Sequence, residues 1–215
     1  MFEKLRPRLN RIAEPMGRLL VKLGIGPNHI TILGFVFSLI AGLFYSMNHY
    51  GWGGLFVILA GTMDGLDGTV ARLTKKSSKR GAFLDSVFDR LGEAVIFAGI
   101  IISLSKPLYQ LIGILAMSLS FIISYLRARA ESLGLEMRGI GLMERGDRML
   151  FIMAMSIVGY LWPNHEAGFV FMLVLLLVLV MITVIQRFTT LYDGLEAIAE
   201  EEKSAEIVEA NEVRN

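Results

Sequence analysis

Long stretches without charge are the feature that most constrains this sequence. Four such runs cover residues 30–47, 107–126, 149–164 and 167–186. A helix needs about 20 predominantly apolar residues to cross a bilayer, so these runs predict transmembrane helices. The composition agrees, because 54% of the 215 residues are hydrophobic, only 19% are charged and the mean hydropathy is +0.57.

Two further apolar segments raise the number of predicted spans to six. One ends in a group of aspartates and the next begins with another. The predicted spans cover about 30–47, 52–73, 82–105, 107–130, 146–163 and 167–190. We therefore predict an all-α integral membrane protein, with a single membrane domain over residues 1–195.

The segments on either side of the spans differ in character. Residues 1–23 repeat apolar side chains every three or four positions between basic ones, which predicts an amphipathic helix along the cytoplasmic membrane surface. A soluble flanking helix is the alternative. The stretch GIGPNHIT at 24–31 should end that helix at its glycines and Pro27 and start the next. Residues 196–215 are acidic and predict a solvated or frayed cytoplasmic tail.

Basic residues gather on one side of the predicted spans. Six precede the first span, and the loops after the second and fourth spans carry Lys75, Lys76, Lys79, Arg80, Arg138 and Arg145. The opposite connections contain only Lys106. By the positive-inside rule, both termini and the long loops should face the cytoplasm, in the plasma membrane. Residues 1–24 lack the continuous apolar region of a cleavable signal.

Four aspartates stand at helical spacing beside the membrane. Asp64 and Asp67 are three residues apart, whereas Asp85 and Asp89 are four apart, so each pair should project from one face of its helix. The short connection between the two helices makes them antiparallel neighbours and brings the four carboxylates together. Four carboxylates in a low-dielectric setting predict bound divalent cations. The chain has no cysteine, so oxygen ligands favour two Mg²⁺ or Mn²⁺ ions.

Glycines and an arginine accompany these acids. Gly65, Gly68 and Gly81 leave room for a ligand, and Arg72 lies two turns after Asp64, within reach of a phosphate held by the metals. This combination is typical of phosphoryl transfer. Alternatively, the acids could form a salt-bridge network with the basic loop over 75–80. A cation channel or carrier would also place acids in the membrane, although the fixed charge of Arg72 opposes a cation path.

The segment from 64 to 89 resembles the signature of the CDP-alcohol phosphotransferases. The pattern is D-x2-D-G-x2-A-R-x8-G-x3-D-x3-D, matched by Asp64, Asp67, Gly68, Ala71, Arg72, Gly81, Asp85 and Asp89. The resemblance implies a six-helix membrane enzyme with a cytoplasm-facing site. It also implies transfer of a substituted phosphoryl group from a CDP-linked lipid to an acceptor hydroxyl, with release of CMP.

The same resemblance implies roles for individual residues. Asp64, Asp67, Asp85 and Asp89 are expected to hold the metals, and Asp89 is also expected to be the general base. Six further positions correspond to the site of the CDP-lipid: Pro27, Asn28, Thr31, Gly68, Arg72 and Ser78. For Pro27, Asn28 and Thr31, a simple helix cap is the alternative.

The acceptor is predicted from arginines outside the signature. Five lie at the end of the fourth span and in the next loop, Arg127, Arg129, Arg138, Arg145 and Arg148, and Arg187 lies in the sixth span. Arginine forks suit phosphate, whereas positive-inside anchoring is the alternative. The pattern resembles the phosphatidylinositol-phosphate and archaetidylinositol-phosphate synthase branch. That resemblance implies that Arg127, Arg148 and Arg187 hold the acceptor phosphate, with Arg145 a rival for the second.

The predicted reaction therefore joins a phosphatidyl or archaetidyl group to inositol phosphate. Glycerol 3-phosphate is the alternative acceptor, and no nucleic-acid partner is expected. The resemblance also implies a homodimer. Small residues in spans three and four would permit close helix packing, namely Gly99, Ser103, Gly113, Ala116 and Ser120.

Overall fold

The computed structural model describes residues 13–75, 78–137, 139–162 and 165–214, and every regular element in these ranges is a helix. A helix over residues 13–22 is followed by α2 (Pro27–Ser46), α3 (Tyr50–Leu73), α4 (Lys79–Ser103), α5 (Pro107–Ser132), α6 (Arg145–Leu161) and α7 (His165–Arg214). The all-α prediction is confirmed for the described residues, and each of the six predicted spans corresponds to one helix.

Four of these helices are long and apolar enough to cross a membrane. They are α2, α3, α5 and the His165–Glu200 part of α7. By contrast, α4 carries six charged residues in its first 15 positions, from Lys79 to Glu93, and α6 has only 17 residues. The chain is therefore a membrane protein, and crossing by α4 and α6 stays a prediction.

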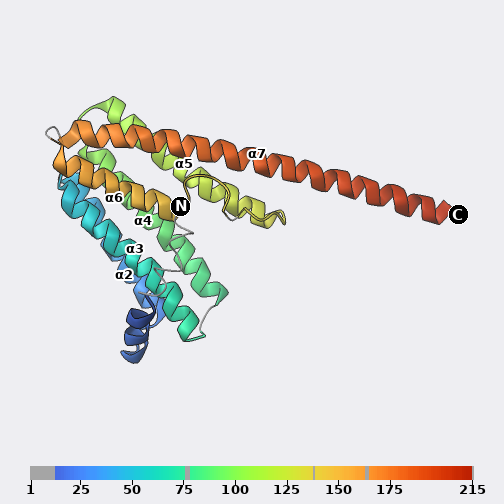
Figure 1. Ribbon diagram of the computed structural model, residues 1–215, viewed down its shortest axis with the longest axis horizontal. Coiled ribbons are helices and arrows are strands. Elements are labelled where there is room, and N and C mark those ends of the chain that lie inside the picture. Colours follow the sequence, from blue (N-terminus) through green and yellow to red (C-terminus); the bar gives the residue numbers. More distant parts are fainter. Residues whose placement is uncertain (1–12, 76–77, 138, 163–164, 215) are drawn as a thin grey trace.

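The helices share one apolar core that extends from α2 to α7. In Figure 1, α2, α3 and α4 lie together, and α6 runs between α3 and α7. Helices α2 and α4 approach each other closely, since a Cβ atom built on Gly99 would lie 2.1 Å from the carbonyl oxygen of Gly42. Only glycine allows two helix backbones to meet so closely.

The small residues of the third and fourth spans pack inside the protomer. Gly99 contacts α2, Gly113 faces Ile101 of α4, and the other three are buried, namely Ser103, Ala116 and Ser120. They are used for packing between helices of one chain. The predicted homodimer therefore gains no support from these positions.

The N-terminal helix packs against the ends of α2 and α3. Gly17 lies against Thr69 and Leu73, whereas Met16 and Leu19 are exposed. As the sequence predicts, the chain breaks before Pro27: Gly24 adopts a φ of 75° and Gly26 is the N-cap of α2. The predicted surface helix over 1–23 lies within the described residues only from residue 13.

The sequence predicts a solvated or frayed tail over 196–215, and the described structure is helical there up to Arg214. Helix α7 continues without a break to Arg214 and projects beyond the other helices in Figure 1. Leu191 and Leu195 still pack beside Ala130 and Met137. The acidic composition did not prevent helix formation, because Glu, Ala and Lys are all strong helix formers.

Candidate active site

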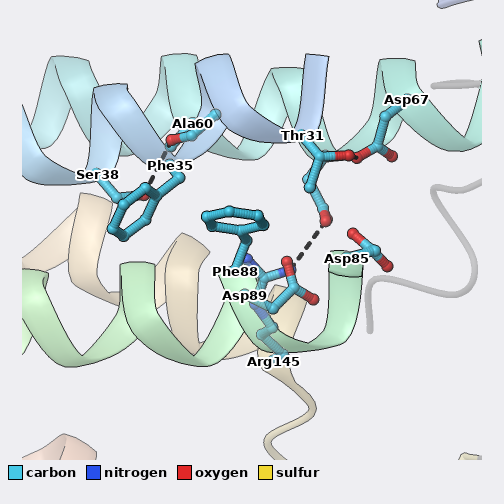
Figure 2. Close-up of a pocket in the computed structure, with 11 residues that line it drawn as sticks. Thr31, Phe35, Ser38, Ala60, Asp67, Asp85, Phe88, Asp89 and Arg145 are labelled. Carbon is cyan, nitrogen blue, oxygen red and sulfur yellow. Dashed lines mark hydrogen bonds and ion pairs between the residues drawn. The ribbon is translucent and has the colours of Figure 1, made fainter. Parts of the chain in front are cut away.

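Two helices carry the four aspartates to a common pocket. Asp64 and Asp67 lie near the end of α3, and Asp85 and Asp89 lie near the start of α4. Figure 2 shows Asp67 and Asp85 facing one another from the two sides of this pocket. The predicted convergence of the carboxylates is thus seen in the structure.

Three of the acids form a compact set of oxygen ligands. One carboxylate oxygen from each of Asp64, Asp67 and Asp85 lies within 4.8 Å of the others. Asp67 is buried, and Oδ1 of Asp85 is buried with no hydrogen-bond partner among the described residues. A buried carboxylate oxygen without a donor is costly unless a cation supplies the missing interaction. The set therefore fits a hard divalent cation such as Mg²⁺ or Mn²⁺.

Asp89 and Asp64 both contact an arginine, Arg145. Oδ1 of Asp89 accepts a 2.7 Å contact from Nη1 of Arg145, which also lies 2.9 Å from Oδ1 of Asp64. Arg90 lies 3.9 Å from the second oxygen of Asp89. Among the described residues, no loop lysine pairs with any of the four acids, so the alternative of a loop salt-bridge network is not favoured.

Helix α2 supplies the remaining wall of the pocket. Thr31 donates a 2.7 Å hydrogen bond to Oδ2 of Asp67, which fixes the orientation of that carboxylate. Eleven residues line the pocket, and five of them were not singled out in the sequence: Gly34, Phe35, Ser38, Ala60 and Phe88. Residues 31, 34, 35 and 38 follow helical spacing on one face of α2. This spacing, read from the sequence, could have identified the α2 residues that line the pocket.

The residues predicted to bind the CDP-lipid lie around the same ends of α2, α3 and α4. Ser78 is the N-cap of α4 and accepts a 3.0 Å hydrogen bond from the amide of Gly81, which in turn faces Asn28. Pro27 opens α2. On α3, the guanidinium of Arg72 lies beside Gly68 and donates to Thr69.

The α3 surface beside Asp64 is free of obstruction. A Cβ atom built on Gly65 would meet no atom within 4 Å, and one built on Gly61 would also meet none. This bare stretch of helix gives a ligand access to the backbone next to the acids.

Arg148 lies in an ion pair rather than in the aspartate pocket. Its guanidinium donates to both carboxylate oxygens of Glu93, at 2.7 and 2.9 Å, and to the carbonyl of Met143. The side chains of Arg148 and Glu93 are completely buried. These contacts weigh against a direct role of Arg148 in holding an acceptor. Glu93 was missed in the sequence because it lies beyond the signature.

The other arginines lie around this pair. Arg187 is almost completely buried and donates to the carbonyls of Ile123 and Ile140. Nη2 of Arg187 also lies 3.8 Å from Oε1 of Glu144. Arg127 is exposed and pairs with Glu131. Arg90, which the sequence analysis did not consider, has a buried Nη1 without a hydrogen-bond partner in the described part of the chain. Arg138 lies outside the described residues.

Comparisons with known proteins agree with this geometry. The CDP-alcohol phosphatidyltransferase family matches residues 25–189. An archaetidylinositol phosphate synthase from Pyrococcus horikoshii is 37% identical over 73% of this chain and 82% of its own length. A phosphatidylinositol phosphate synthase from Mycobacteroides abscessus is 34% identical over 85% of this chain and 84% of its own.

Solved structures are similar over the whole fold. The Mycobacterium tuberculosis phosphatidylinositol phosphate synthase with CDP-DAG bound aligns with a TM-score of 0.76 and 29% identity, over 85% of this chain and 94% of that one. The same enzyme with manganese and citrate aligns with a TM-score of 0.76 and 28% identity, over 84% and 88% of the two chains. The chain therefore belongs to the CDP-alcohol phosphatidyltransferase family and is a CDP-alcohol phosphotransferase.

Proposed function

We propose that this protein transfers a phosphatidyl or archaetidyl group from a CDP-linked lipid to a hydroxyl of myo-inositol phosphate and releases CMP. The observation that carries the proposal is the convergence of Asp64, Asp67 and Asp85 within 4.8 Å, with Asp89 beside them. The names of the relatives at 34% and 37% identity support the choice of acceptor.

The reaction is a substitution at the β-phosphorus of the donor. The acceptor oxygen forms a bond to that phosphorus, and the bond from phosphorus to the oxygen bridging the two phosphates breaks, so CMP leaves with that oxygen. Asp89 takes the proton of the attacking hydroxyl. Two divalent metals, when bound by the four acids, neutralise the diphosphate and stabilise the leaving group.

The chain's own residues provide the rest of the site. The open backbone at Gly65 and Gly68, with Arg72 beside it, suits the phosphates and sugar of a nucleotide. Asn28 and Ser78 border the same region from α2 and α4. The lipid chains of the donor remain in the bilayer while its diphosphate reaches the acids at the membrane edge.

A phosphorylated acceptor is favoured by the arginines of α4 to α7. Arg145 reaches the acids directly, and Arg90 lies 3.9 Å from Asp89. Arg127 and Arg187 are proposed to complete the group. Such a group suits an anion that carries two charges. The enzyme is proposed to act as a homodimer of six-span protomers in the plasma membrane, with both termini and the site facing the cytoplasm.

The test is a CMP-release assay on the purified protein in lipid. CDP-diacylglycerol and CDP-archaeol serve as donors, each offered inositol phosphate, glycerol 3-phosphate or free inositol, with and without Mg²⁺ or Mn²⁺. We expect metal-dependent CMP release with inositol phosphate. Faster release with glycerol 3-phosphate would replace the proposed acceptor, and release without any acceptor would contradict the transfer reaction.

The proposed base is tested by Asp89→Asn. The amide keeps the size of the side chain but cannot take a proton, so CMP release should fall by about 10² to 10⁴. A circular-dichroism melt in detergent checks that the variant is folded. Release at the wild-type rate would show that another group takes the proton.

A further inference from the structure

Arg145 lies among the acids as an internal cation. A single nitrogen, Nη1, lies 2.9 Å from Asp64 and 2.7 Å from Asp89, so it bridges the aspartate of α3 to that of α4. In Figure 2, Arg145 lies directly beside Asp89. A charge-assisted contact of this length is strong, and the two carboxylates cannot give the same lone pairs to another cation while it persists.

Asp64 and Asp89 are the described ion-pair partners of Arg145, and the charge of Glu93 attracts it without a described contact. Its Nε is buried and has no hydrogen-bond partner among the described residues, so the two carboxylates are its only described ion-pair partners. A buried donor without an acceptor is a cost that a new anion could remove. Among the described residues, the close contacts of the guanidinium are thus those with Asp64 and Asp89.

The α6 backbone that carries Arg145 is held by contacts that do not involve Arg145 itself. One turn further along α6, Arg148 is held by the fully buried pair with Glu93, which itself lies one turn beyond Asp89 on α4. Helix α6 otherwise packs on α3 and α7. Departure of Arg145 from the acids therefore requires only a side-chain rotation and leaves α6 in place.

We propose that Arg145 exchanges between two anions: it neutralises Asp64 and Asp89 when they hold no metal, and it would turn to the phosphate of the acceptor when those carboxylates hold one. The second half of this inference rests on the proposed function. Metal must therefore precede the phosphorylated acceptor, because the guanidinium that binds the acceptor is otherwise occupied.

The first half is tested by Mn²⁺ binding without any substrate. Arg145→Met removes the competing cation and keeps the aliphatic length, so the protein should bind Mn²⁺ about tenfold more tightly than wild type in calorimetry. Arg145→Lys keeps the charge and should remain close to wild type. Arg129→Met is the matched control, because Arg129 is an exposed arginine whose described hydrogen bond goes to Ser132.

Unchanged or weaker Mn²⁺ binding by Arg145→Met would overturn the exchange, since Arg145 would then support the metal site rather than compete for it. Arg145→Gln repeats the measurement if the Met variant does not fold. Both results are independent of which acceptor the enzyme uses, so they remain valid if the CMP-release assay rejects inositol phosphate.

The second half is tested with inorganic phosphate as the probe. Wild-type protein saturated with Mn²⁺ should bind phosphate more tightly than the metal-free protein, and Arg145→Met should lose most of that gain while still binding Mn²⁺. Equal phosphate affinity of the two metal-loaded proteins would overturn this half. Equal phosphate affinity of wild type with and without metal would do so as well.

Discussion

Thr31 links α2 to the acids through one hydrogen bond, to Oδ2 of Asp67. The resemblance to the family placed Thr31 near the nucleotide, whereas the described structure gives it a contact with a predicted metal ligand. A hydroxyl that donates to a ligating carboxylate orients it and fixes which oxygen remains for the metal. This role was not readable from the sequence, because the two residues are 36 positions apart.

Thr31→Val should weaken Mn²⁺ binding by about tenfold, since removal of such an outer hydrogen bond usually costs 10- to 100-fold in metal affinity. Thr31→Ser, which keeps the hydroxyl, should bind Mn²⁺ nearly as wild type does. Thr62→Val is the matched control, because Thr62 donates only to the carbonyl of Ile58 within α3. An unchanged affinity in Thr31→Val would exclude this orienting role.

At the scale of helices, the pair of Glu93 and Arg148 joins α4 to α6. Glu93→Ala leaves a buried guanidinium without its counter-ion and should lower the free energy of unfolding by about 3–5 kcal/mol. The double variant Glu93→Met with Arg148→Met should recover most of that loss, because an apolar pair of similar volume needs no counter-charge. Thermal unfolding in detergent measures both.

The exposed pair of Arg127 and Glu131 provides the comparison for this experiment. Glu131→Ala should change the free energy of unfolding by about 1 kcal/mol or less, as expected for a surface ion pair. A loss of similar size in Glu93→Ala and Glu131→Ala would mean that the buried pair does not fasten α4 to α6.

Gly99 carries a second prediction at this scale. Gly99→Ala places a methyl group 2.1 Å from the backbone of Gly42, so α2 and α4 must separate. The free energy of unfolding should therefore fall by about 1–3 kcal/mol. Gly61→Ala adds the same methyl group to an open helix surface and should not destabilise the protein. Equal melting temperatures for the two variants would contradict the close crossing.

The helices themselves were predictable, and their pairing was not. Apolar runs bounded by glycine, proline or charge indicated all six, as the start of α2 at Pro27 illustrates. The convergence of the four aspartates was also predictable. The spacing within each pair and the short connection between α3 and α4 are enough to bring the carboxylates together. Contacts such as Glu93 with Arg148, or Gly99 with Gly42, join residues far apart in sequence. No local sequence pattern predicts which distant residue each of them contacts.

For the whole molecule, we predict that α4 and α6 cross the membrane together with the other four helices. The chain contains no cysteine, so single cysteines can report which side of the bilayer a loop faces. With six spans, Asn48→Cys and Lys106→Cys should react with an impermeant maleimide added outside intact cells. Thr74→Cys and Ser132→Cys should react only after permeabilisation. If Lys106→Cys behaved like Thr74→Cys, α4 would not cross.

The buried pair between α4 and α6 also has a consequence for synthesis of the protein. Glu93 leaves the ribosome 55 residues before Arg148, which at about 5–20 residues per second is a delay of about 3–11 s. During that interval the carboxylate of Glu93 lacks its ion-pair partner Arg148, and the cation near it in sequence is Arg90, one turn earlier on α4. If α4 and α6 cross the membrane, we therefore expect stable insertion of α4 to wait until α6 emerges and the ion pair can form.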